Sequence, residues 1–153
     1  MAEIFYVLEE MGHASQIATG IAMNQPQRPV YCFDGDGASL MHMGSMAITG
    51  TRNLSNLTHL VFNNGCHESV GGQPTVAQKF KFSEVASALG YEFSETVYDE
   101  EDLKKIIIKA QSNKTSSFIE ILVRSGHRSN IGRPTTKPIQ NKIALMKSLH
   151  QDI

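Results

Sequence analysis

The chain has 153 residues, which suits one domain that buries roughly 68–70% of its unfolded surface. Its 14 lysines and arginines nearly balance 15 aspartates and glutamates, so the composition provides no field that would attract nucleic acid. No apolar run approaches the roughly 20 residues of a membrane span, and no signal peptide pattern opens the chain. We therefore expect a cytoplasmic domain with reduced cysteines.

The first 62 residues predict two helices and two buried strands. Residues 4–8 are apolar and fit either a short strand or a loop packed on the domain, and residues 12–23 carry small apolar residues on one helical face. The apolar runs 30–33 and 57–62 predict two buried strands, and residues 39–52 between them predict a helix. A crossover helix of this length returns the chain parallel to its start, so both strands end at the same edge of a sheet.

The second half of the chain continues the alternation of helices and strands. Residues 76–89 predict a helix that ends before Gly90, residues 93–97 a strand, and residues 99–111 a helix with an acidic first turn. The apolar density of residues 117–123 predicts a strand covered on both faces, and residues 140–150 fit a final amphipathic helix. This order predicts an α/β fold with three layers, in which a mostly parallel sheet carries helices on both faces.

Polar, glycine-containing sequence follows each of the first two strands. The first strand ends in DGDG at residues 34–37 and the second in NNG at residues 63–65, with 28 residues from Asp36 to Asn64. Ligands of open α/β sheets bind beyond the carboxyl ends of the strands, where this carboxylate and this carboxamide would face each other. With a backbone carbonyl they would fill half the octahedral shell of Mg²⁺ and leave room for a diphosphate. Gly35 and Gly37 would let backbone N–H groups approach it closely.

The spacing of GDG and NN resembles the metal and diphosphate motif of thiamine diphosphate-dependent enzymes. Four blocks in order, MGHASQIA, GDGASLMHMG, NNGCHESVGGQPT and RSNIGRPTTKP, resemble the phosphonopyruvate decarboxylases among the 2-oxo acid decarboxylases of this family. The resemblance spans residues 5–143 and implies the thiamine diphosphate-binding fold, with thiamine diphosphate and Mg²⁺ as cofactors. It also implies a 2-oxo acid substrate, phosphonopyruvate, which would be converted to phosphonoacetaldehyde and CO₂.

The resemblance also implies roles for individual residues. The Mg²⁺ ligands would be Asp36, Asn64 and the carbonyl of Cys66. The cofactor would further contact Met11, Gly35, Gly37, Ala38, Ser39 and His42. Among these, Met11 would wedge the cofactor into its bent conformation or serve only as a core residue, and His42 would lie near the thiazolium ring.

Further candidates follow the metal motif and lie near the end of the chain. His67, Glu68 and Ser69 come directly after the metal loop and are candidates for proton transfer or substrate contact. The segment 124–137 is rich in Gly, Pro, Ser and basic residues, so it predicts an irregular tail. Its Arg128, Arg133 or Lys137 would bind a phosphonate, a sulfonate or a phosphate, or the segment is a solvated loop.

The resembled enzymes have a second domain, which carries the glutamate that activates the aminopyrimidine of the cofactor. We expect residues 1–153 to form the diphosphate-binding domain alone, with the pyrimidine-binding domain absent and the isolated chain inactive. Either a second chain would then supply that domain in a homo- or hetero-oligomer, or the chain is a truncated product. The alternatives are the beta subunit of a sulfopyruvate decarboxylase and a non-catalytic module that binds a diphosphate or self-associates. Glu9 and Glu10 replace Gly-Ser of the resembled family and favour the non-catalytic module.

Overall fold

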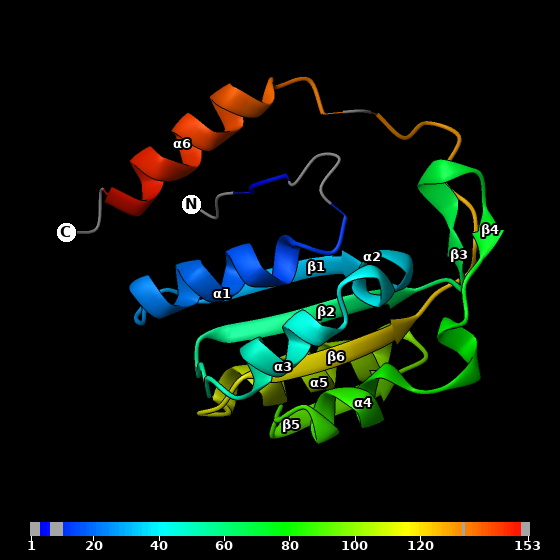
Figure 1. Ribbon diagram of the computed structural model, residues 1–153, viewed down its shortest axis with the longest axis horizontal. Coiled ribbons are helices and arrows are strands. Elements are labelled where there is room, and N and C mark those ends of the chain that lie inside the picture. Colours follow the sequence, from blue (N-terminus) through cyan, green and yellow to red (C-terminus); the bar gives the residue numbers. More distant parts are fainter. Residues whose placement is uncertain (1–3, 7–10, 133, 151–153) are drawn as a thin grey trace.

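The structure, a computed structural model, describes residues 4–6, 11–132 and 134–150. Its centre is a sheet of four strands in the order β1-β2-β6-β5, in which every neighbouring pair is parallel. The strands are β1 (Val30–Gly35), β2 (Leu57–Asn63), β5 (Phe93–Val97) and β6 (Ser117–Leu122). All four predicted strands are therefore confirmed, and their carboxyl ends meet at one edge of the sheet (Figure 1).

Helices lie on both faces of the sheet, as predicted (Figure 1). One face is covered by α1 (Ala14–Asn24), α3 (Gly44–Gly50) and α4 (Phe82–Ala88), and the other by α5 (Glu100–Ser112). A final helix, α6 (Pro138–His150), runs beside α1 at the β1 side of the sheet. Among the described residues, no helix combines the length and the apolar character needed to cross a membrane.

The cover of the α5 face is incomplete. Helix α5 packs on β5, on β6 and on Leu60 of β2, but it leaves the edge strand β1 largely bare. On this face the side chains of Tyr31, Phe33 and Phe62 are exposed, Phe33 by 64%. The rings of Phe33 and Phe62 lie 6.0 Å apart at the carboxyl end of their strands, where they form an exposed aromatic pair.

Two predicted helices are interrupted in the structure. Residues 39–52 form the short helix α2 (Asp36–Met41) and then α3, because His42 leaves the helical conformation and Gly44, a poor residue for a helix interior, follows it. Residues 76–89 begin as the 3₁₀ turn η2 (Ala77–Lys79), and α4 starts only after Phe80 has adopted an extended backbone. Both single-helix predictions were wrong, because the apolar spacing continues through the break.

The segment after β2 contains structure that the sequence analysis did not predict. The two-residue strands β3 (Cys66–His67) and β4 (Gln73–Pro74) pair antiparallel, with the 3₁₀ turn η1 (Glu68–Val70) between them. Described residues 124–132 and 134–137 contain no helix or strand, which confirms the irregular tail for that part of it. Residues 4–6 are irregular too, while residues 7 and 8 of the predicted apolar segment lie outside the described residues.

A buried carboxylate joins three elements below the carboxyl edge. Glu120 of β6 is 1% exposed, and its carboxylate oxygens accept hydrogen bonds from Asn63 Nδ2 at 2.8 Å and Thr96 Oγ1 at 2.9 Å. Thr96 is in turn bonded to Ser83 of α4 at 2.6 Å. Because a buried carboxylate is costly without such donors, these bonds fix the end of β2 where the metal motif begins.

We expect Glu120→Ala to lower the free energy of unfolding by about 2–4 kcal/mol, because buried donors on Asn63 and Thr96 lose their acceptor. Urea denaturation measures the change. The control is Glu95→Ala on the neighbouring strand, whose exposed ion pair with Lys109 spans 3.7 Å and contributes less than about 1 kcal/mol. Equal losses in the two variants would contradict a structural role for the buried carboxylate.

Candidate functional site at the carboxyl edge of the sheet

The pairing of β1 with β2 places the two halves of the predicted metal motif side by side. Gly35 pairs with Phe62, so Asp36 and Asn64 leave the sheet at the same edge. Asp36 is 2% exposed, and its Oδ2 accepts a short hydrogen bond of 2.6 Å from Thr75 Oγ1. The second carboxylate oxygen of Asp36 carries further lone pairs with which to bind a cation.

Helix α2 starts at Asp36 with donors that no side chain caps. Its N-cap, Gly35, has no side chain, and the first N–H groups of any helix have no acceptor within the helix. Ser39 is 4% exposed, and its hydroxyl has no hydrogen-bond partner in the described part of the chain. Clustered N–H donors and an orphaned hydroxyl fit the oxygens of a diphosphate, and Gly35, Gly37, Ala38 and Ser39 lie at this start of α2.

The loop that carries Asn64 is held by its own hydrogen bonds. Asn64 Oδ1 accepts from the N–H of Cys66 at 3.1 Å, and Asn64 Nδ2 lies 3.4 Å from Glu68 Oε2. An amide oxygen has a second lone pair that remains for a metal ion. Asn64, the Cys66 carbonyl and Asp36 provide only oxygen ligands, which is the set that Mg²⁺ prefers. The residues present therefore fit the predicted metal ion.

Glu68 links this loop to the irregular tail. Its Oε2 accepts hydrogen bonds from the N–H of Gly126 at 3.0 Å and from the Cys66 thiol at 3.1 Å. These two donors, together with the nearby His127, hold the pKa of Glu68 below its usual range, against a smaller opposing effect of burial. Donation to the carboxylate also raises the pKa of the Cys66 thiol. Glu68 is thus a tether between loop and tail.

The predicted histidines lie close to α2. The imidazole of His67 lies against Gly37, where an added Cβ would collide with the ring, so any larger residue would force His67 to move. His42, at the end of α2, stacks on His13 with ring centroids 4.2 Å apart. Half-buried Met11 directly precedes Gly12, which has no room for a side chain against His42. The segment before α1 therefore lies over α2, as the predicted cofactor contact requires.

Other candidates are less closely associated with the site. Ser69 is exposed in η1, and Arg128 and Lys137 are exposed on the tail. Arg133, Glu9 and Glu10, on which further predictions rested, lie outside the described residues.

Two residues that were not predicted from the sequence also shape the site, Thr75 and Glu120. Thr75 binds Asp36 and also accepts from the N–H of Ala77 at 3.2 Å, which ties α2 to the chain after β4. Glu120 holds Asn63, the first residue of the NN pair. A charged residue inside the apolar run of β6 was a signal, because charges in buried strands are almost always paired. Thr75 had no comparable signal.

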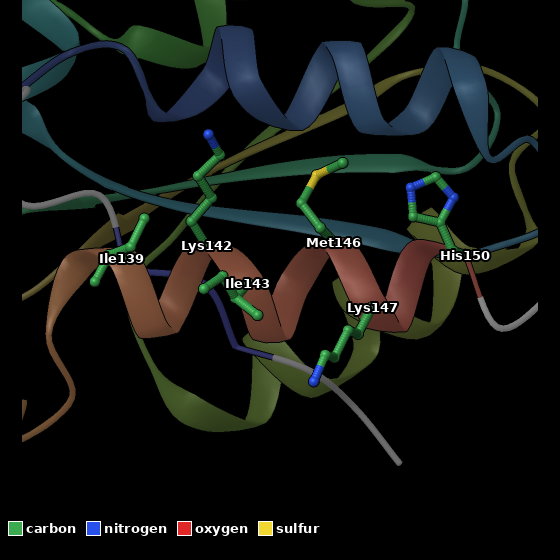
Figure 2. A pocket seen from close by; sticks show the side chains of 6 residues that line it. All are labelled: Ile139, Lys142, Ile143, Met146, Lys147 and His150. Carbon is green, nitrogen blue, oxygen red and sulfur yellow. The ribbon is translucent and has the colours of Figure 1, made fainter.

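A groove along α6 lies away from this edge. Figure 2 shows its lining residues, Ile139, Lys142, Ile143, Met146, Lys147 and His150. A second hollow joins Met146 and His150 to the end of α1 near Gln25, which leads into the start of β1 rather than its carboxyl end. The metal motif therefore lies elsewhere on the molecule.

Comparison with known proteins assigns the family. The model for the C-terminal TPP binding domain of thiamine pyrophosphate enzymes matches residues 4–121. The chain belongs to this family. It is 35% identical to a phosphonopyruvate decarboxylase of Streptomyces viridochromogenes over 89% of this chain and 34% of that protein. It is 30% identical to the sulfopyruvate decarboxylase subunit beta of Methanococcus maripaludis over 95% of this chain and 77% of that subunit.

A solved structure with a different sequence has the same fold. The 2-oxoglutarate:ferredoxin oxidoreductase of Magnetococcus marinus matches with a TM-score of 0.62 at 18% identity, over 75% of this chain and 46% of that chain. This likeness confirms the predicted three-layer α/β fold. The chain spans about a third of the length of the phosphonopyruvate decarboxylases that it matches.

We expect Glu68→Gln to accelerate alkylation of Cys66 severalfold near pH 8. The raised pKa of the Cys66 thiol leaves less thiolate at a given pH, so its alkylation rate rises at a higher pH than that of an ordinary thiol. Removal of the Glu68 carboxylate should lower this pKa and move the rise to lower pH. Iodoacetamide modification in a Cys32→Ser background measures this site alone. Glu84→Gln, an exposed change on α4, should leave the rate unaltered. Equal rates in all three proteins would contradict the thiol–carboxylate contact.

Proposed function

We propose that this domain binds the diphosphate of thiamine diphosphate through Mg²⁺ as half of a 2-oxo acid decarboxylase. One observation supports the proposal above others: the buried Asp36 lies at the uncapped start of α2, beside the orphaned Ser39 hydroxyl and the Asn64 loop. An anion and a hard cation together would satisfy these groups. When bound, the cofactor supplies an electron sink for the carbanion left by decarboxylation.

The residues of this chain would anchor and orient the cofactor. Asp36, Asn64 and the Cys66 carbonyl would hold Mg²⁺, while the N–H groups at the start of α2 and the Ser39 hydroxyl would bind diphosphate oxygens. Thr75 orients the Asp36 carboxylate by its 2.6 Å hydrogen bond. His67, packed on Gly37, would form a wall beside the diphosphate and is in place to contact substrate or to hold a proton.

The substrate we propose is a 2-oxo acid with a tetrahedral anionic group. Phosphonopyruvate is the first candidate because the relatives with that name match 88–89% of the chain, and its products would be phosphonoacetaldehyde and CO₂. Sulfopyruvate is the second, because the chain covers 77% of a subunit beta of sulfopyruvate decarboxylase. Glu68 holds Gly126 next to the Asn64–Cys66 loop, and Arg128 follows two residues later on the exposed tail, so we propose it as the residue that binds the anionic group.

We further propose a partner that carries the pyrimidine-binding domain, either as a separate chain or as further sequence. The match to subunits named beta supports a separate chain. The exposed aromatic pair Phe33 and Phe62 supports a partner domain of either kind, since exposed apolar groups mark interaction surfaces.

We expect the purified chain to bind thiamine diphosphate in Mg²⁺ and to lose that binding in EDTA. Asp36→Asn should weaken the affinity for thiamine diphosphate by about tenfold or more, because a charged carboxylate binds Mg²⁺ more strongly than a neutral amide does. Calorimetric titration measures both effects. The control is Asp102→Asn, the same change on the exposed face of α5, which should bind like the wild type.

If the isolated chain does not bind, the titration is repeated with a candidate partner chain. Binding only in the mixture would show that the site needs its second wall. Absence of binding in both cases, or wild-type affinity in Asp36→Asn, would refute the cofactor site and favour a non-catalytic module.

We expect Arg128→Ala to raise the KM of the reconstituted enzyme for its anionic substrate by about tenfold with kcat little changed, because a charge-assisted hydrogen bond is lost from substrate binding. Steady-state decarboxylation of phosphonopyruvate and of sulfopyruvate measures the effect and the preference. Arg52→Ala, an exposed arginine after α3, is the matched control. An unchanged KM in Arg128→Ala would exclude that side chain from substrate binding.

A further inference from the structure

Three residues with metal-binding side chains meet inside the protein, below the predicted magnesium loop. Cys32 and Asp34 occupy alternate positions of β1 and so point to the same face of the sheet. His59 is the register partner of Cys32 on β2. All three are buried, with exposed fractions of 4%, 9% and 1%.

The spacing of their polar atoms suits a tetrahedral ion. The thiol sulfur, a carboxylate oxygen and an imidazole nitrogen all lie within 4.8 Å of one another. His59 Nε2 and Asp34 Oδ2 are 3.6 Å apart, which is longer than a hydrogen bond. Two ligand atoms on a tetrahedral ion with bonds of about 2.0–2.2 Å lie about 3.3–3.6 Å apart, which matches this separation.

The imidazole of His59 is oriented as a ligand would be. Its Nδ1 lies 3.3 Å from the hydroxyl of Tyr91, which also hydrogen-bonds to Thr49. Thr19 donates its proton to the Ser15 carbonyl, so Thr49 donates to Thr19 at 2.8 Å. The Thr49 oxygen is then left to accept from Tyr91, and the Tyr91 hydroxyl accepts from His59 Nδ1–H. Nε2 then carries a lone pair, and this buried atom has no hydrogen-bond partner in the described residues. Metal-binding histidines are held by their other nitrogen in this way.

Charge also favours a cation at this place. Within the described part of the chain, the buried Asp34 carboxylate accepts one hydrogen bond, from the N–H of Gly35 at 3.0 Å, and its Oδ2 lies 3.6 Å from the unpartnered Nε2 of His59. Burial and the Asp34 carboxylate raise the pKa of the Cys32 thiol, so without a metal ion the thiol keeps its proton. A divalent ion would displace that proton to solvent, and one thiolate, one carboxylate and one neutral imidazole would leave the site without net charge.

We propose that Cys32, Asp34 and His59 bind a divalent ion of the zinc type, with water as the fourth ligand. Sulfur, nitrogen and one oxygen form a ligand set for a borderline-soft ion, whereas the set at Asp36 contains oxygen alone and suits Mg²⁺. The two sites are therefore chemically distinct, although Asp34 and Asp36 are two residues apart. A bound ion would fix Asp34, whose hydrogen bond to Gly35 sets the backbone from which α2 starts.

Cobalt(II) is the probe for this site, because a thiolate ligand gives it a charge-transfer band in the near ultraviolet. The full chain in a Cys66→Ser background has Cys32 as its only thiol. Cobalt is added both to the folded protein and during refolding from urea, since the site is closed to solvent. We expect a thiolate–cobalt band that saturates at one ion per chain, disappears on addition of zinc, and is absent from the Cys32→Ser/Cys66→Ser double variant.

Two comparisons make the outcome decisive. Asp36→Asn in the same background should keep the band, which separates this site from the proposed magnesium site, and circular dichroism checks that every variant is folded. The isosteric Cys32→Ser change should also remove the rise in melting temperature that zinc produces. No band under either loading condition, a band that survives Cys32→Ser, or a band lost in folded Asp36→Asn would each overturn the proposal.

Discussion

The parallel pairing of β1 with β2 is the interaction on which the candidate site depends. Its register ends the two strands together, with Gly35 beside Phe62, so that two loops 28 residues apart begin at one edge. Because side chains alternate along a strand, a slip of one residue would turn Asp34 toward the opposite face and Phe33 toward the helices. The same pairing therefore sets both the metal loop and the polar interior beneath it.

That interior contains more polar groups than stability alone would favour. On the face covered by α1, α3 and α4, Asp34 and His59 lie near one another and Asn63 meets Glu120, all of them buried. Each group costs free energy on burial and regains it only through its partners. Several of the partner residues lie at or next to strand ends, so these hydrogen bonds hold the carboxyl edge of the sheet in one arrangement. Rigid support of this kind is what a binding site requires.

The sequence predicted the elements better than the contacts between them. Apolar runs identified every strand of the sheet, and the spacing of GDG and NN placed the motif at the correct edge. The break after Met41 was missed, because apolar spacing does not record where a backbone leaves the helix. Contacts between distant residues were missed as well: Glu68 binds Gly126 across 58 residues, and no periodicity encodes such a pair. His59 was not predicted as a site residue, because it lies inside the apolar run 57–62.

The distribution of paired and unpaired hydrogen-bonding groups explains how the carboxyl edge of the sheet could bind a diphosphate without rearranging. On the loop side, Asn64 and Cys66 already bond to each other and to Glu68, so that side is ordered before any ligand arrives. On the helix side, α2 begins without a side-chain cap, and the Ser39 hydroxyl has no hydrogen-bond partner among the residues that the structure describes. A diphosphate would therefore add hydrogen bonds where they are missing and break few that exist. The entropic cost of ordering the site on binding is then small, which is the advantage of a preorganised site.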